Sequence, residues 1–121
     1  QLTKMVNQIC IAGLIQALAE GIHFSSQAGL NTADVMDVIT KGAAQSWQME
    51  NRWKTMLNDK YDFGFAVDLM RKDLDIVLKQ AKKMNTELEI TDLVNSFYKD
   101  IQKLGGGRWD TSSLLKRIQE K

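Results

Sequence analysis

The chain has 121 residues, of which 44% are hydrophobic and 26% are charged, and its net charge is +1. This length and mixture suit one globular domain, and the near balance of charges excludes the basic surface typical of proteins that bind nucleic acid or anionic membranes. Gln16 and Glu20 interrupt the longest apolar run, so we expect no membrane span. A single cysteine, Cys10, excludes an internal disulfide and favours a reducing, cytoplasmic location.

The first predicted element is a long helix from Leu2 to about Ala28. Apolar residues recur at helical spacing from Leu2 to Ile22 and fill more than one stripe, which predicts a helix buried on several sides. Gly29 is the residue type that ends a helix in a left-handed conformation. The chain has no proline, which favours long helices, and it starts at Gln1 inside this pattern, so we expect a segment of a longer protein.

Two shorter helices are expected next, each with its own capping side chain. Asn31 is the expected cap of a helix that ends at Gly42, and Ser46 is the expected cap of a helix that runs to Leu57. Residues 58–64 are rich in turn formers and show no periodicity, which predicts a loop.

The second half of the chain predicts three more helices. One runs from about Phe65 to Met84, and a capping box from Thr86 to Glu89 indicates the start of the next. The glycines at 105–107 end that helix, and Asp110 is the expected cap of the last one. No strand-type alternation of useful length is present. The sequence therefore predicts an all-α domain of about six helices packed around the long N-terminal helix.

Most enzyme signatures are absent. His23 and Cys10 are the only histidine and cysteine, so a His/Cys metal site cannot form and we expect no bound metal. The glycine run at 105–107 follows no strand and matches no phosphate-binding pattern, which leaves a helix terminator as its simplest interpretation.

One polar cluster interrupts the first helix, and it consists of Thr3, Lys4, Asn7 and Gln8. Lys4 lies three and four residues before the two amides, so their head groups share one face. A lysine beside amides and a core can be partly desolvated and tuned toward proton transfer. A solvated polar patch at a helix terminus explains the same residues.

Two further groups have structural alternatives of the same kind. Phe63 and Phe65, followed by Lys72 and Asp73, are also explained by aromatic packing beside a charged surface helix. The pair at 46–47, a serine and a tryptophan, is also explained by a cap and an anchoring aromatic.

Four segments, together spanning nearly the whole chain, carry a resemblance to a known family. They are Lys4-Met5-Val6-Asn7-Gln8, Gly42-Ala43-Ala44-Gln45-Ser46-Trp47, Phe65 followed by Lys72-Asp73-Leu74, and Gly107-Arg108-Trp109-Asp110-Thr111-Ser112-Ser113. In this order they resemble the C-terminal domain of the β-hydroxyacid dehydrogenase family. That family includes 3-hydroxyisobutyrate dehydrogenase, tartronate semialdehyde reductase and, more distantly, 6-phosphogluconate dehydrogenase.

The resemblance implies a single helical domain over residues 1–121, similar to the C-terminal domain of 6-phosphogluconate dehydrogenase. Its implied partners are an N-terminal Rossmann domain absent from this chain, a small 3-hydroxy acid that is interconverted with its semialdehyde, NAD or NADP, and further copies in a homodimer or higher oligomer. The family's site roles fall on six residues: Lys4 as the catalytic acid/base, Asn7 and Gln8 as substrate ligands, and Lys72, Phe65 and Asp73 as cofactor contacts. Gln8 stands where the family often has asparagine.

The chain alone is therefore expected to be inactive, because the missing domain would hold most of the cofactor. The alternative function is a non-catalytic helical domain whose apolar faces serve a protein partner or self-association. The residues that distinguish NAD from NADP lie in the Rossmann domain, so this sequence encodes neither that choice nor the identity of the hydroxy acid.

Overall fold

The computed structural model describes all 121 residues. Its elements, in chain order, are α1 (Leu2–Gln27), α2 (Thr32–Ile39), α3 (Trp47–Leu57), α4 (Val67–Lys83), α5 (Glu89–Lys103), the 3-10 turn η1 (Thr111–Ser113) and α6 (Leu114–Gln119). No strand forms, and one isolated bridge pairs Ala66 with Asp110 in antiparallel fashion. The prediction of an all-α domain of about six helices is confirmed.

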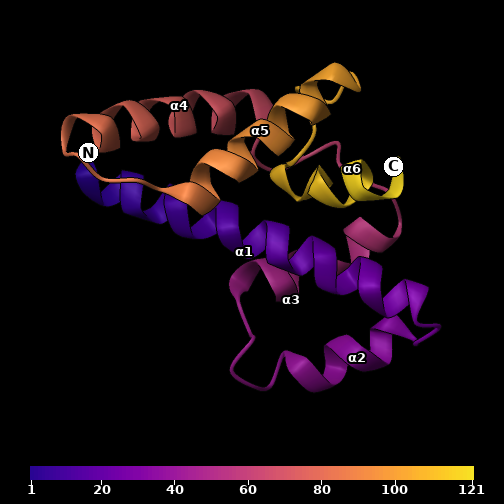
Figure 1. Ribbon diagram of the computed structural model, residues 1–121. Helices are drawn as coiled ribbons and strands as arrows, with labels where there is room; N and C mark the ends of the chain where they lie inside the picture. Colours follow the sequence, from indigo (N-terminus) through magenta and orange to yellow (C-terminus); the bar gives the residue numbers. More distant parts are fainter.

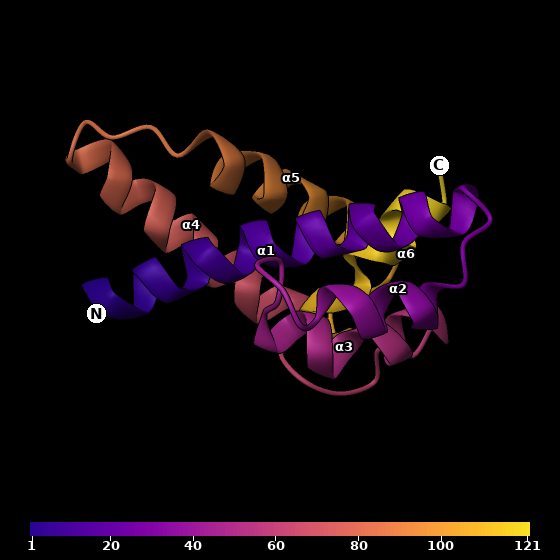
Figure 2. The same cartoon turned by 90° about the horizontal axis from the view of Figure 1, so that it is seen from below.

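Helix α1 is the central element, and every other helix packs against it. Figure 1 shows α4 and α5 along its N-terminal half and α6 beside its C-terminal half, with α2 and α3 on the opposite side. In the turned view of Figure 2 the two termini lie at opposite ends of the molecule. The N-terminal end of α1 is thus covered by α4 and α5 on one side only.

One hydrophobic core holds the helices together. Helix α1 contributes small and branched side chains, among them Ala12, Ala19 and Ile22, which are fully buried. Tyr98 of α5 is also fully buried, and this burial, reinforced by the nearby charge of Asp110, raises the pKa of its hydroxyl above the usual range. The neutral hydroxyl donates a hydrogen bond of 3.2 Å to the backbone oxygen of Thr111, which ties η1 to the core.

By length and composition, α1 is long and apolar enough to cross a membrane. The expectation that no segment meets these two criteria is therefore wrong. In the folded chain this helix lies at the centre of the bundle. A core helix that is apolar on several sides passes the same test as a membrane span.

The predicted caps in the first half of the chain are confirmed, but the second helix ends at Ile39 rather than at Gly42. The backbone of Gly29 has a φ of +76°, the left-handed conformation that ends α1. The side chain of Asn31 accepts from the N–H of Asp34 at 3.1 Å, and that of Ser46 accepts from the N–H of Met49 at 3.0 Å. These short-range hydrogen bonds satisfy N–H groups that a helix start leaves free.

Two predicted boundaries in the second half are wrong. Helix α4 starts at Val67 rather than at Phe65, because Phe65 is tied to the segment around Asp110 and lies outside the helix. The capping box does not form: α5 begins at Glu89 without a side-chain cap, and the hydroxyl of Thr86 bonds back to the oxygen of Met84.

The carboxylate of Asp110 organises the junction before α4. Asp110 is 2% exposed, and it accepts hydrogen bonds from the N–H of Phe65, from the N–H and hydroxyl of Ser112, and from Nε of Arg52. Charge-assisted hydrogen bonds of this kind are stronger than neutral ones. One side chain therefore joins α3, the loop before α4 and the turn before α6.

We expect Asp110→Ala to lower the free energy of unfolding by about 3 kcal/mol, because it leaves a partly buried guanidinium, two backbone N–H groups and one hydroxyl group unpaired. Urea denaturation measures this. Asp37→Ala is the matched control, since the pair of Asp37 with Lys41 at 3.6 Å is largely exposed and contributes about 0.5 kcal/mol or less. Equal effects of the two variants would contradict the role of Asp110.

Candidate functional site

The predicted lysine lies at the edge of a small hollow between α1 and α4, called here the Lys4 hollow. Its volume is about 100 Å³, and it is lined by Gln1, Lys4, Met5, Gln8, Asp73, Ile76 and Val77. The side chain of Lys4 is exposed and forms no ion pair. The structure thus brings Lys4, Gln8 and Asp73 into one hollow. Within this chain Lys4 remains exposed to solvent, so the partial desolvation that the sequence analysis considers is not present.

A chain of hydrogen bonds orders the side chains around this hollow. Nδ2 of Asn7 donates to Oε1 of Gln8 at 3.0 Å, and Nε2 of Gln8 donates to Oδ2 of Asp73 at 2.9 Å. A carboxylate accepts but cannot donate, so Asp73 sets the orientation of the Gln8 amide, which in turn sets that of Asn7. The exposed Asn7 side chain is left with its own oxygen free to accept a hydrogen bond.

A second and larger concavity, the Arg52 hollow, lies on the other side of Gln8. Its volume is about 400 Å³, and its polar and aromatic lining comes from Gln8, Trp47, Arg52, Phe65, Asp110 and Thr111. Gln8 is 6% exposed and lines both hollows. The two hollows are therefore neighbouring parts of one surface that runs from α1 to α3.

The six predicted site residues do not all meet. Lys4, Gln8 and Asp73 share the Lys4 hollow, and Phe65, which is 37% exposed, lines the Arg52 hollow. Asn7 reaches the site through its bond to Gln8. Lys72 lies on the exposed side of α4 next to Asp73 and lines neither hollow.

Sequence reasoning missed Arg52 as a residue of the site. Its guanidinium carbon lies 5.0 Å from the ring centre of Trp47 and 4.9 Å from that of Phe63, between the two aromatics. Its Nε lies 3.2 Å from Oδ2 of Asp110, a residue 58 positions later. No local spacing in the sequence predicts such a contact. The sequence indicates only separate local roles for its partners, packing for the two aromatic residues and helix capping for Asp110.

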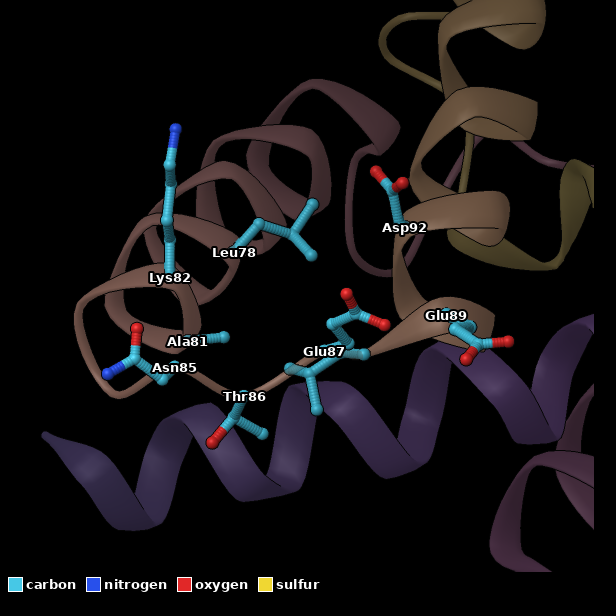
Figure 3. Close-up of a pocket in the computed structure, with 9 residues that line it drawn as sticks. Leu78, Ala81, Lys82, Asn85, Thr86, Glu87, Glu89 and Asp92 are labelled. Atoms are coloured by element: carbon cyan, nitrogen blue, oxygen red, sulfur yellow. The ribbon is translucent and has the colours of Figure 1, made fainter.

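A wider hollow of about 620 Å³ lies between the end of α4 and the start of α5. Figure 3 shows the carboxylates of Glu87, Glu89 and Asp92 on the connecting loop and on α5, with Lys82 extending away from them. None of the predicted site residues lines it. These carboxylates are not arranged to hold a metal ion, and no other group of three or more histidine, cysteine or acidic side chains is.

Nearly the whole chain matches one protein family. Residues 1–118 match the family model described as NAD-binding of NADP-dependent 3-hydroxyisobutyrate dehydrogenase. The chain belongs to this family. The resemblance to β-hydroxyacid dehydrogenases is thereby confirmed, and NAD(P) use is a property of the 3-hydroxyisobutyrate dehydrogenase family as its description states.

Relatives of the 3-hydroxyisobutyrate dehydrogenase family are named as oxidoreductases. An uncharacterised oxidoreductase of Shewanella frigidimarina is 60% identical over 99% of this chain, and the L-threonate dehydrogenase of Haemophilus influenzae is 32% identical over 93% of it. The 2-hydroxy-3-oxopropionate reductase of Escherichia coli is 29% identical over 98% of it. The chain covers 41%, 38% and 41% of these proteins, so it spans about two-fifths of their length.

Solved structures agree with the fold. The 3-hydroxyisobutyrate dehydrogenase of Salmonella typhimurium superposes with a TM-score of 0.85 at 30% identity, over 95% of this chain and 40% of that one. The 3-hydroxyisobutyrate dehydrogenase of Mycobacterium tuberculosis superposes with a TM-score of 0.89 over 98% of this chain and 43% of that one, and at 20% identity it supports the fold alone.

The hydrogen bond between Gln8 and Asp73 has a measurable consequence. We expect Asp73→Ala to lower the free energy of unfolding by about 1–2 kcal/mol, because it leaves the buried Gln8 amide without its acceptor. Lys72→Ala is the neighbouring control and should change stability by less than about 0.5 kcal/mol, since Lys72 is exposed and unpaired. Denaturant titration measures the stability of both variants. An Asp73 variant as stable as the control would contradict a stabilising hydrogen bond between Gln8 and Asp73.

Proposed function

We propose that this chain is the substrate and dimerisation domain of an NAD(P)-dependent dehydrogenase that interconverts a small 3-hydroxy acid and its semialdehyde. The observation that carries the proposal is the shared hollow of Lys4, Gln8 and Asp73 on a chain of the 3-hydroxyisobutyrate dehydrogenase family. A nucleotide-binding domain outside these 121 residues would supply the opposite wall. The chain by itself is then inactive.

Lys4 is the residue to which we assign proton transfer. Its ammonium has no carboxylate partner in the chain, so it is free to donate to, or after deprotonation to accept from, the hydroxyl oxygen of a bound substrate. It stands in the first turn of α1, where unpaired backbone N–H groups add a partial positive charge. Both features attract the carboxylate of a hydroxy acid.

The amides beside Lys4 hold the substrate in our proposal. Because Asp73 and Gln8 orient the Asn7 amide, its free oxygen is an acceptor in a defined position. A substrate hydroxyl that donates to this oxygen would be held near Lys4 in one orientation. Positioning of this kind lowers the entropic cost of reaction.

The residues present also fit one edge of a nicotinamide cofactor. Lys72 is an exposed cation without an ion pair, and it is the residue before Asp73, which lines the Lys4 hollow. Such a lysine suits the anionic phosphates of a dinucleotide. When bound, the nicotinamide ring would accept or return the two electrons of the reaction, while the chain's own part is to hold the hydroxy acid and move its proton.

A second copy of the chain is the partner that we assign to the apolar surface opposite the core. Leu2 and Val6 on α1 are both 59% exposed, and Ile90 and Leu93 on α5 are 66% and 52% exposed. Ile90 lies against Gly13 of α1, so the two helices form one continuous surface. Large exposed apolar patches are typical of interfaces, and most soluble oligomers consist of copies of one chain. A non-catalytic interaction domain would use the same surface.

The catalytic assignment is tested in the protein that joins this chain to its nucleotide-binding domain. We expect Lys4→Ala and Lys4→Arg each to lower kcat by about 10²- to 10⁴-fold, because alanine removes the proton carrier and arginine keeps the charge but does not deprotonate. Lys99→Ala, at another exposed lysine on α5, should leave kcat unchanged. Full activity of Lys4→Arg would rule out proton transfer by this residue.

The dimer is tested by sedimentation equilibrium of the 121-residue chain. We expect Val6→Asp to shift the equilibrium toward the monomer, because it places a charge in an apolar interface. Val38→Asp is the control at a similarly exposed valine, 70% exposed, on α2. The single cysteine, Cys10, is exposed on α1, and its alkylation should slow as the protein concentration rises. A monomer at every concentration would contradict the proposal.

A further inference from the structure

A hollow of about 660 Å³ lies between the C-terminal half of α1, the middle of α5 and α6, and is called here the α1–α6 hollow. It shares no lining residue with the Lys4 hollow or the Arg52 hollow. Phe97 and Ile118 in its lining are partly buried, whereas Phe24, which also lines it, is 72% exposed. An aromatic ring left this exposed beside a hollow is typical of a surface that another molecule covers.

Two large apolar side chains protrude beside this hollow. Ile90 and Leu93 of α5 are 66% and 52% exposed. They lie two turns and one turn before Phe97, which lines the hollow, along the same helix. Ile90 also lies against Gly13 of α1, a short distance before the first lining residue of the hollow, Gln16. The protruding pair and the hollow are therefore neighbouring parts of one surface.

The protruding pair and the hollow match in a twofold dimer, in which both copies use the same surface. Ala17 of α1 is exposed and lies midway in the sequence between Gly13 and Gly21. When two α1 helices pack antiparallel about an axis beside Ala17, Gly13 of each copy faces Gly21 of the other. Because Ile90 lies against Gly13 and Gly21 lines the hollow, each Ile90 then meets the hollow of the other copy. A side chain at Gly21 would meet nothing within 4 Å in its own chain, which leaves room for this approach.

The charges around the two features are complementary. The lining of the hollow includes the cations Arg117 and Lys121 and a single carboxylate, Glu20. Arg117 is paired within the chain, whereas Lys121 forms no ion pair. Glu89 and Asp92 directly precede the two protruding residues, and both are exposed without an ion pair. Opposite charges that meet across an interface favour one orientation of the partners, so the protruding segment suits this hollow in charge as well as in shape.

The surface is large enough for a stable dimer. Helix α1 has 26 residues and is about 39 Å long, and with the flanking α5 and α6 the surface is two helix diameters, or roughly 20 Å, wide. The resulting area of roughly 800 Å² per copy is that of a standard stable interface. We infer that two copies pair antiparallel along α1, with Ile90 and Leu93 of each copy seated in the α1–α6 hollow of the other. This inference rests on the dimer proposed above and is independent of the role of Lys4.

Sedimentation equilibrium of the 121-residue chain tests the protruding pair. We expect Ile90→Ala to raise the dissociation constant of the dimer roughly 30-fold or more, because it removes a buried anchor from both copies. Ile76→Ala is the matched control, at an isoleucine of α4 that is 47% exposed and lies outside this surface. Equal dissociation constants of the two variants would overturn the inference.

Gly21→Leu tests the hollow. The added side chain enters open space in its own chain, and leucine favours a helix more than glycine does, so we expect the unfolding temperature to stay the same or rise. We nevertheless expect the dissociation constant to rise by about tenfold or more, because the side chain blocks the closest approach of the two helices. A dimer of unchanged affinity in this variant would also overturn the inference.

Nuclear Overhauser contacts between the two copies test the geometry most directly. In a mixture of chains with isotopically labelled isoleucine methyl groups and unlabelled chains, we expect contacts from the Ile90 methyl groups to the Phe24 ring of the other copy. Within one chain Ile90 lies against Gly13, which is about 16 Å along α1 from Phe24 and too far for such a contact. A dimer without these contacts would overturn the inference and leave the proposed dimer standing. A monomer at every concentration would overturn both, whereas the catalytic proposal is decided separately by the Lys4 variants.

Discussion

The packing of all the other helices against α1 is the constraint on which the rest of the structure depends. Each of the other helices packs against this single proline-free element, so its rotation about its own axis is fixed by the core. With that rotation set, helical geometry places Gln8 at the meeting point of α1, α4 and the loop before α4, and places Lys4 one turn earlier at the open rim. The position of the site is therefore set by the packing of the helices in the core, outside the site itself.

Two buried or half-buried carboxylates then tie distant segments to this helix. Asp73 accepts from Gln8, which lets a polar side chain remain 6% exposed within an apolar helix. Asp110 accepts from Arg52 and from the N–H of Phe65, and so holds the wall of the larger hollow in place. Lys4 takes part in neither of these two hydrogen-bond networks. An unengaged cation beside ordered amides is the arrangement that acid–base chemistry on a hydroxy acid requires, provided a second wall excludes water.

The parts of the fold that could be predicted from the sequence are those encoded over a few residues. Helix periodicity and the caps at Asn31 and Ser46 act within one turn, so the elements of the first half were predicted with nearly correct boundaries. The bonds from Gln8 to Asp73 and from Arg52 to Asp110 join residues 65 and 58 positions apart, and local patterns carry no information on such pairs. The predicted start of α4 is two residues early for the same reason, because the N–H of Phe65 donates a hydrogen bond to Asp110, 45 positions later, and does not join the helix.

A crystal structure of the joined two-domain protein with its nicotinamide cofactor and a bound hydroxy acid tests the central claim most directly. We expect Nζ of Lys4 within about 3 Å of the substrate's hydroxyl oxygen, with the Gln8 amide still directed at Asp73. A substrate whose hydroxyl lies beyond the reach of Lys4, or whose site does not include the Lys4 hollow, would contradict the account.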